Sequence, residues 1–193
     1  VNINIADQDN VGAIVGYNEG TTENSLTEGT VKGNNFVGGL IGYNNNGNIT
    51  FLLSTVTVEG KENVGGVIGY NHGGTIENAS ATKNVQGTGN NVGGLIGKSE
   101  NGAIINSTAA GDVNGFFYIG GLVGQNTNGQ ITNAYATGNV NGTWYVGGLI
   151  GENIRGKIES TYATGKVTGS TYIGGLVGIS HEGYIMNSYA IGE

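Results

Sequence analysis

Apolar residues and glycines recur along this chain with a period close to 27 residues. One six-residue phrase combines an apolar residue, a glycine, a small residue, two apolar residues and a second glycine. It begins at residues 11, 37, 64, 92, 119, 146 and 173, so successive copies are 26, 27, 28, 27, 27 and 27 residues apart. Such a period predicts stacked supersecondary units, each of which can bury its apolar face only against its neighbours.

The pattern inside each unit indicates extended chain rather than helix. Apolar residues do not recur at three- and four-residue intervals, glycine falls inside every candidate segment, and valine, isoleucine, threonine and tyrosine are frequent. Each unit contains three pieces separated by turn signals. These are the six-residue phrase, a short piece around an isoleucine such as Ile131, and a piece of small residues that ends in a valine such as Val140.

We therefore predict an all-β fold, a right-handed parallel β-helix or β-solenoid with three short strands per coil and about seven coils of 27 residues. The spacing alone does not determine the handedness. At a spacing of about 4.8 Å per coil, the rod would be about 33 Å long. A β-propeller is the alternative, but its blades need about 40 residues and four antiparallel strands. We expect residues 1–193 to form a single repeat domain that is a segment of a longer protein.

The repeated phrase contains one local conflict with a flat strand. Its fourth and fifth positions are both apolar, as in Leu40 and Ile41, although successive strand residues face opposite sides. Either the chain turns a corner there, or one column forms an outward apolar stripe. We favour a corner or bulge, because the preceding glycines permit unusual backbone angles.

Asparagines recur at equivalent turn positions, and in a solenoid such residues stack on one another. An asparagine at a turn can adopt the left-handed conformation and can pass amide hydrogen bonds to the coils above and below. We predict a structural ladder at Asn18, Asn44, Asn71, Ser99, Asn126, Asn153 and Ser180. A second candidate column, interrupted by Phe51 and Ser160, contains Asn24, Asn78, Asn106, Asn133 and Asn187.

Composition excludes several classes of protein. The net charge is −7, only 11% of the residues are charged, and no cysteine is present. A nucleic-acid binder would carry a basic surface, so we expect no nucleic-acid partner. No apolar run reaches the roughly 20 residues that span a bilayer, so we expect no membrane insertion of this segment. Disulfides and thiolate metal sites are excluded.

The repeat resembles the GLUG-motif family, which is defined by a Gly-Leu-apolar-Gly core. The sequence GGLIG stands at 38–42, 93–97 and 147–151, and GGLVG stands at 120–124 and 174–178. The copies at 12–16 and 65–69 depart from the motif. The resemblance extends over almost the whole chain. It implies a β-solenoid repeat of bacterial surface and adhesin-like proteins and of accessory regions of immunoglobulin A peptidases, and it brings no catalytic residues.

A search for catalytic and metal-binding patterns finds none. The zinc peptidases associated with the family resemble enzymes with an H-E-x-x-H helix, but the second histidine after His181 and Glu182 would fall at Ile185. The three aspartates, Asp7, Asp9 and Asp112, are scattered, and no calcium-binding nonapeptide recurs. We therefore expect no enzymatic activity, no catalytic residues, no cofactor and no metal site.

Aromatic residues form the best candidate for a ligand or adhesion surface. The candidate residues lie just ahead of the repeated phrase in three consecutive coils, and they are Phe117, Tyr118, Trp144, Tyr145 and Tyr172. Tyr135, Tyr162 and Tyr189 repeat in the third piece. Rings about 4.8 Å apart can stack on each other or on sugar faces. The structural alternative is a stack that only stiffens the C-terminal half.

These observations predict a non-catalytic extracellular module at the bacterial cell surface, a stiff stalk or adhesin segment. Its expected partners are host or environmental glycans or proteins, with end-to-end or lateral self-association. One alternative is an accessory module of a secreted peptidase or other surface enzyme. Another is the subunit of a self-assembling filament. An ice-binding surface would need a regular threonine array, and Thr82, Thr137 and Thr164 are not repeated in every coil.

Overall fold

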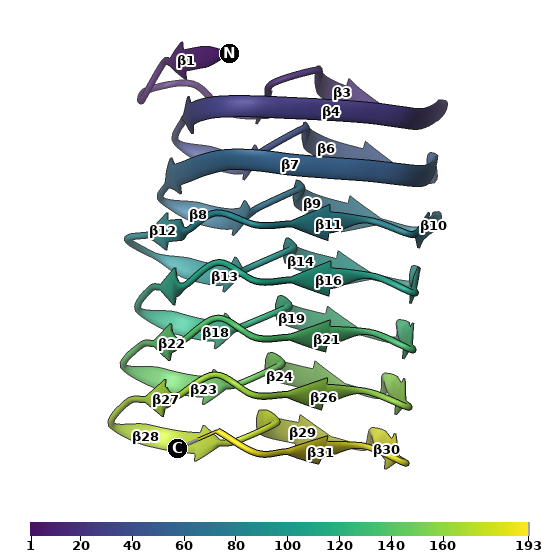
Figure 1. Ribbon diagram of the computed structural model, residues 1–193, viewed down its shortest axis with the longest axis vertical. Coiled ribbons are helices and arrows are strands. Elements are labelled where there is room, and N and C mark those ends of the chain that lie inside the picture. The colour runs from purple at the N-terminus through teal and green to yellow at the C-terminus, as the bar shows by residue number, and fades with distance from the viewer. Residues whose placement is uncertain (193) are drawn as a thin grey trace.

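The computed structural model describes residues 1–192, which wind into a β-solenoid of about seven coils (Figure 1). Glu193, the last residue of the predicted repeat domain, lies outside the described residues. Every strand pairing is parallel, and its partners are equivalent residues of successive coils. Val64, for example, pairs with Val37 on one side and with Val92 on the other. The prediction of a parallel β-solenoid with a 27-residue coil is confirmed.

The coil is right-handed. Figure 1 shows the chain running along the near face from right to left and returning behind it, while each coil lies one step further toward the C-terminus. Parallel strands joined by a crossover connection adopt this hand almost without exception.

Two of the three faces carry one strand per coil. Sheet 2 is formed by β2 (Val11–Gly12), β5 (Asn35–Gly38), β8 (Glu62–Gly65), β13 (Asn90–Gly93), β18 (Phe117–Gly120), β23 (Trp144–Gly147) and β28 (Thr171–Gly174). Sheet 3 is formed by β3 (Val15–Asn18), β6 (Ile41–Asn45), β9 (Ile68–His72), β14 (Ile96–Glu100), β19 (Val123–Thr127), β24 (Ile150–Ile154) and β29 (Val177–His181).

The third face, sheet 1, is wider. It begins with β1 (Asn2–Asn4) and the continuous strands β4 (Thr21–Lys32) and β7 (Asn48–Gly60). In later coils the same path is divided into strands of two or three residues. A left-handed residue lies on this path in both cases, as Asn24 (φ 49°) does within β4 and Asn78 (φ 56°) does between β10 and β11. These strands are β10 (Thr75–Glu77), β11 (Ser80–Ala81), β12 (Val85–Gly87), β15 (Ala103–Ile105), β16 (Thr108–Ala109), β17 (Val113–Asn114), β20 (Gln130–Thr132), β21 (Tyr135–Ala136), β22 (Val140–Asn141), β25 (Lys157–Glu159), β26 (Tyr162–Ala163), β27 (Val167–Thr168), β30 (Tyr184–Met186) and β31 (Tyr189–Ala190).

The core consists of columns of identical or similar apolar residues. One cluster contains the leucines and isoleucines of the repeated phrase, together with the isoleucines and alanines of sheet 1. A second cluster packs the valines that begin the phrase against the valines of the third strand of sheet 1, as Val92 and Val113 illustrate. Both clusters run the length of the rod, so each coil buries its apolar side chains against the coils on either side.

The paired apolar residues of the phrase lie at a corner. Leu122 and Val123 are both fully buried, and they lie where the chain passes from sheet 2 to sheet 3. The corner interpretation is therefore confirmed, and the outward stripe is excluded at this position.

The glycines of the phrase are required by close backbone packing. A Cβ atom on Gly121 would overlap the carbonyl oxygen of Gly148 in the next coil and would press on Ala136. A Cβ atom on Gly124 would overlap backbone atoms of the preceding coil, including Gly97 O. These contacts explain why the motif retains glycine at positions where the chain has no positive φ angle.

Candidate functional site

The tyrosines just ahead of the repeated phrase have an unusual backbone conformation. Tyr118, Tyr145 and Tyr172 all have φ 56°, in the left-handed region. In the pairing of β13 with β18, the residues on either side are in register while Asn91 and Tyr118 are left out of the ladder. Each tyrosine is therefore a local bend in its strand, and the bend lies at the same place in neighbouring coils. For a bulky residue this conformation costs roughly 1 kcal/mol or more.

These three tyrosines form a continuous stack. The ring centroids of Tyr118 and Tyr145 are 4.9 Å apart with an interplanar angle of 15°, and those of Tyr145 and Tyr172 are 5.0 Å apart with an angle of 1°. Stacking of this kind contributes about 0.5–1.5 kcal/mol per pair beyond the buried area. The stack therefore offsets the strain of the left-handed backbone, and it covers both faces of the Tyr145 ring.

The other two residues of the predicted aromatic surface form a second, shorter stack. Phe117 and Trp144 are in register in β18 and β23, with centroids 6.0 Å apart and an interplanar angle of 19°. Phe116 packs edge-on against Phe117 at 4.8 Å. Trp144 is 38% exposed. All five predicted residues thus lie on one side of the rod, in two neighbouring rows on sheet 2.

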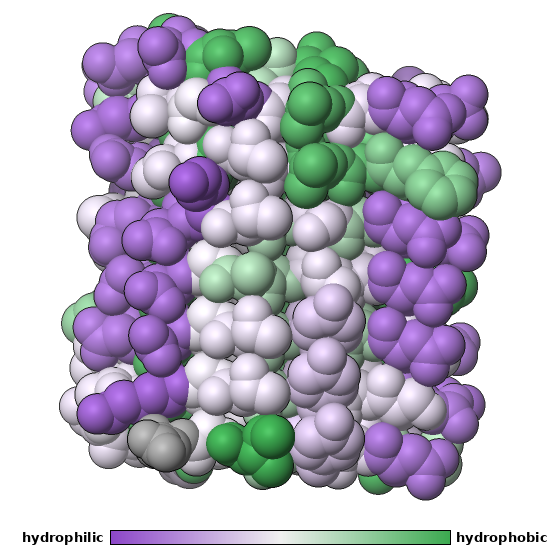
Figure 2. Space-filling view, viewed as in Figure 1, coloured by the Kyte–Doolittle hydropathy of each residue, from purple (hydrophilic) through white to green (hydrophobic). Residues whose placement is uncertain are grey.

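A third row of rings lies on sheet 1. Tyr135, Tyr162 and Tyr189 stack with centroid distances of 4.7 and 5.3 Å and interplanar angles of 5° and 7°. In the first coils the same row contains Leu26 and Leu53 instead. Figure 2 shows the resulting hydrophobic cluster toward the N-terminal end of this face and the paler residues below it.

The predicted asparagine ladder lies inside the solenoid, at the end of sheet 3. Asn18 Nδ2 donates to Asn44 Oδ1 at 2.7 Å, and Asn44 Nδ2 donates to Asn71 Oδ1 at the same distance. In the C-terminal half, Asn126 Nδ2 donates to Asn153 Oδ1 at 2.9 Å. The amide groups also donate to a carbonyl oxygen of the adjoining turn, as Asn44 does to Gly47 at 2.9 Å.

The residues with left-handed backbone conformation, which have positive φ angles, do not belong to this ladder. Among residues 1–192, none of the ladder residues has a positive φ. The second asparagine column does, and its members with positive φ are Asn24, Phe51, Asn78, Asn106, Asn133, Ser160 and Asn187. Amide hydrogen bonding and left-handed geometry, which we expected to coincide, are therefore divided between two columns. Buried asparagines form the ladder, and exposed turn asparagines provide the bend.

The ladder is interrupted at Ser99. Asn71 Nδ2 lies 3.4 Å from Ser99 Oγ, and Asn126 Oδ1 on the following coil is buried without a hydrogen-bond donor. A serine side chain is too short to donate to the next coil in the way that the asparagines do. The two halves of the ladder are thus joined only by main-chain pairing.

Replacing Ser99 with asparagine should stabilise the protein. The new amide can accept a hydrogen bond from Asn71 and donate one to the buried Asn126 Oδ1. Satisfying that buried acceptor should raise the unfolding free energy by about 1–2 kcal/mol. We expect the urea midpoint to rise without a change in the slope of the transition. A matched Ser99→Ala variant should lower the midpoint. A Ser99→Asn midpoint at or below that of the wild type would contradict this assignment of the interrupted ladder.

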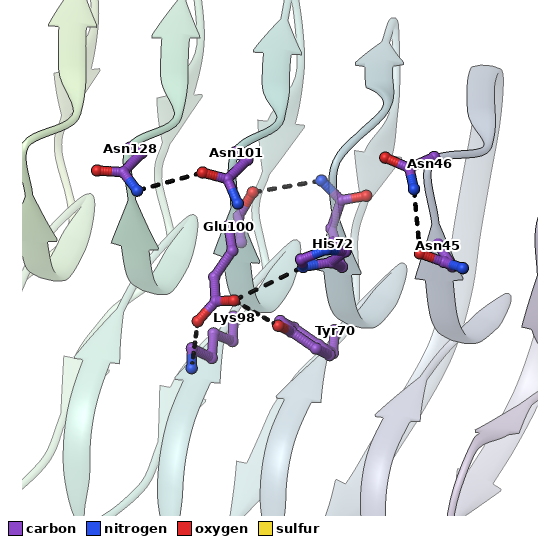
Figure 3. Close-up of polar contacts among 10 residues, drawn as sticks. Asn45, Asn46, Tyr70, His72, Lys98, Glu100, Asn101 and Asn128 are labelled. Carbon is purple, nitrogen blue, oxygen red and sulfur yellow. Dashed lines mark hydrogen bonds and ion pairs between the residues drawn. The ribbon is translucent and has the colours of Figure 1, made fainter.

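The outward face of sheet 3 carries a group of polar and aromatic residues that sequence analysis did not single out (Figure 3). Tyr70 donates through its hydroxyl to Glu100 Oε2 at 2.6 Å, and Lys98 Nζ contacts Glu100 Oε1 at 2.6 Å. His72 Nδ1 lies 3.7 Å from the same carboxylate. The lysine also lies 5.5 Å from the centre of the Tyr70 ring. We call these four residues the Glu100 cluster.

The cluster alters the acidity of its members. Burial alone would raise the pKa of Glu100, but hydrogen bonds from Lys98 and Tyr70, together with the charges of Lys98 and His72, lower it overall. The pKa of Tyr70 is raised, first by burial and then by its hydrogen bond to Glu100. The cluster therefore holds an ionised carboxylate beside a neutral phenol. This arrangement is a surface network that links β9 to β14.

The Glu100 cluster continues an aromatic row at the N-terminal end of the same face. Tyr17 and Tyr43 stack at 5.2 Å, Tyr43 and Tyr70 meet edge-on at 4.8 Å, and Phe36 packs on both Tyr43 and Tyr70 at 5.8 and 5.9 Å. The tyrosine that directly follows the repeated phrase in three copies was the signal that could have indicated this row.

Raised tyrosine pKa values predict a loss of stability in alkali. Burial is the first cause at all four affected residues, Tyr43, Tyr70, Tyr118 and Tyr162. Unfolded tyrosines lose their protons near pH 10, whereas these keep them when folded, so the unfolding free energy should fall as pH rises above about 10. Urea midpoints at increasing pH measure this.

The Tyr70→Phe variant should lose part of that pH dependence. As its control, Tyr184→Phe removes a hydroxyl from a residue that is 71% exposed. Equal pH dependence in the wild type and in Tyr70→Phe would refute the role assigned to the buried phenol.

Some kinds of site are not found within the described part of the chain. Residues 1–192 contain no group of three or more histidine, cysteine, aspartate or glutamate side chains placed to hold a metal ion. Over the same residues, no helix is long and apolar enough to cross a membrane.

Comparison with known proteins identifies one family. The family model described as "Glug: The GLUG motif" matches residues 60–86, 88–114, 117–141 and 142–168, four consecutive repeats that together cover more than half of the chain. Neither the curated proteins nor the solved structures contain a match.

Proposed function

Because the chain belongs to the GLUG-motif family and its repeats build one continuous solenoid, we propose that it is a non-catalytic structural and adhesive module of an extracellular bacterial surface protein. It acts as a stiff stalk, and its lateral faces offer rows of side chains for contact with glycans or proteins.

The observation that carries this proposal is the unbroken line of hydrogen bonds along the rod. Within the leucine column of the motif, Leu95 N donates to Leu122 O at 2.9 Å, and Leu122 N donates to Leu149 O at 2.8 Å. Equivalent bonds join every pair of neighbouring coils on all three faces. Because all of them are directed along the rod axis, the module resists stretching and bending, as a stalk requires.

The surface supports the adhesive part of the proposal. Four rows of aromatic side chains stand on the outside of the rod, one on sheet 1, two on sheet 2 and one on sheet 3. Aromatic residues that are partly exposed provide large apolar contact areas and are enriched at binding surfaces. The net charge of −7 keeps the module soluble and disfavours nucleic acids and anionic membrane surfaces.

Single-molecule stretching tests the stalk directly. With the chain held by its two ends, unfolding should proceed in steps of one coil. Each step should release a contour length of about 90–97 Å, because 27 fully extended residues span about 3.3–3.6 Å each. Between steps the contour length should stay constant as the force rises. A gradual extension at low force, without steps of this size, would contradict a load-bearing role.

A further inference from the structure

The rings of the aromatic rows are mostly unavailable to a ligand, because they cover one another. Tyr145 lies between Tyr118 and Tyr172 at 4.9 and 5.0 Å, with nearly parallel planes. Tyr162 lies in the same way between Tyr135 and Tyr189. A ring that is stacked on both faces presents only its edge to solvent. The tyrosine rows are therefore intramolecular stacks.

Trp144 differs from these rings. Phe117 covers one face of the indole, and the residue in register with Trp144 on the following coil is Thr171. A threonine side chain is too small to cover an indole. Trp144 is 38% exposed, whereas Phe117, Tyr118 and Tyr135, the rings at the N-terminal ends of the other stacks and of its own, are half-buried. Tyr172 and Tyr189, which end their stacks in the last coil, are 52% and 53% exposed. The side of the indole that faces Thr171 is thus an open aromatic surface, which we call the open Trp144 face.

Three hydroxyl-bearing residues neighbour Trp144 in the chain or in the strand ladder. Thr143 precedes it, Thr171 is in register with it on the following coil, and Ser170 precedes Thr171. The amides of Ser170 and Thr171 both donate to the carbonyl oxygen of Thr143, at 3.0 and 3.1 Å, so the main chain holds these three residues together. Within residues 1–192, none of their hydroxyls makes a hydrogen bond to another protein group. None of these positions carries a charge.

We propose that the open Trp144 face binds one ring of a neutral polysaccharide. A pyranose ring presents an apolar C–H face that can lie on the indole and a rim of hydroxyls that can bond to Thr143, Ser170 and Thr171. None of Thr143, Ser170 and Thr171 carries a positive charge that could pair with a carboxylate, which favours neutral sugars over uronic or sialic acids. This proposal rests on the adhesive part of the proposed function and names its ligand class.

One sugar ring stacked on one indole binds weakly. A ligand of this size in a shallow site reaches a dissociation constant of about 1 mM or weaker. Adhesion at this affinity requires many copies of the module on a cell surface and a repeating polymer, so that several contacts form together.

The fluorescence of the chain provides a direct test, because Trp144 is the only tryptophan. The probes are cellohexaose, maltohexaose and chitohexaose, with hexagalacturonic acid as the charged comparison. At least one neutral hexamer should shift the indole emission in a saturable way, at concentrations around 1 mM. The acidic hexamer should bind at least tenfold more weakly. No saturable shift with any neutral hexamer would overturn the proposal.

Two variants locate the binding site. Thr171→Phe should extend the Phe117–Trp144 stack over the open face, so binding should weaken at least tenfold while the melting temperature stays the same or rises. Tyr162→Phe, a change in a fully stacked ring on sheet 1, should leave the titration unchanged. Binding that persists in Thr171→Phe would place the ligand elsewhere and overturn the proposal. If binding fails but the chain still unfolds in coil-sized steps under force, the sugar site is refuted and the stalk is not.

Discussion

Replacing Gly121 with alanine should destabilise the protein by about 4 kcal/mol or more, although the change adds only one methyl group. The new Cβ would overlap the carbonyl oxygen of Gly148 and press on Ala136, and neither can move without breaking the register between two coils. Overpacking against main-chain atoms cannot be relieved by a change of rotamer. Urea unfolding followed by far-ultraviolet circular dichroism measures the effect.

Gly20→Ala is the matched control. Gly20 occupies a turn, its φ is not positive, and nothing lies within 4 Å of the position its Cβ would take. The substitution should leave stability unchanged or raise it slightly, because alanine lowers the entropy of the unfolded chain. If the two alanine variants had similar midpoints, the close packing of coils at the motif glycines would be disproved.

Removing one buried rung of the asparagine ladder should have the next largest effect. Asn44→Ala deletes the donor to Asn71 and to the Gly47 carbonyl and the acceptor used by Asn18. Each buried polar group left without a partner costs about 1–3 kcal/mol, so we expect a loss of about 3 kcal/mol. Chemical denaturation measures it.

The control for the ladder is an asparagine on the outside of the rod. Asn141 contacts Asn114 at 3.4 Å in an exposed pair, so Asn141→Ala should change stability by about 0.5 kcal/mol or less. A loss at Asn44 no larger than the loss at Asn141 would show that the buried amides contribute little.

The architecture could be predicted because one short signal recurs with a nearly constant period. The register of the whole rod follows from aligning residues such as Val37, Val64 and Val92, and the structure pairs these same residues. The corner at Leu122 and Val123 was also predictable, since two adjacent apolar residues cannot both face inward from a flat strand.

The side-chain surface was harder to predict because it depends on local backbone geometry. The bend that places Tyr118, Tyr145 and Tyr172 in the left-handed region has no sequence signal in these coils, since tyrosine rarely adopts that conformation. Asn10, Asn63 and Asn91 occupy the same column, and these three asparagines indicate its geometry.

The Glu100 cluster was missed for a different reason. Its members, Tyr70, His72, Lys98 and Glu100, come from two coils, and no single repeat contains the set. The two outward columns of sheet 3 vary from coil to coil, so the repeat pattern does not indicate which residues meet. Knowledge of the coil register is needed before such contacts can be found.

The central claim is that residues one repeat apart lie one strand spacing apart along a single axis. Pairs of spin labels test it most directly, since the chain has no cysteine and labels can be placed at chosen sites. Labels at Thr55 and Thr164, four coils apart, should lie about 19 Å apart, and labels at Glu28 and Thr164, five coils apart, about 24 Å apart. Distances that do not increase by one strand spacing per coil would contradict the solenoid.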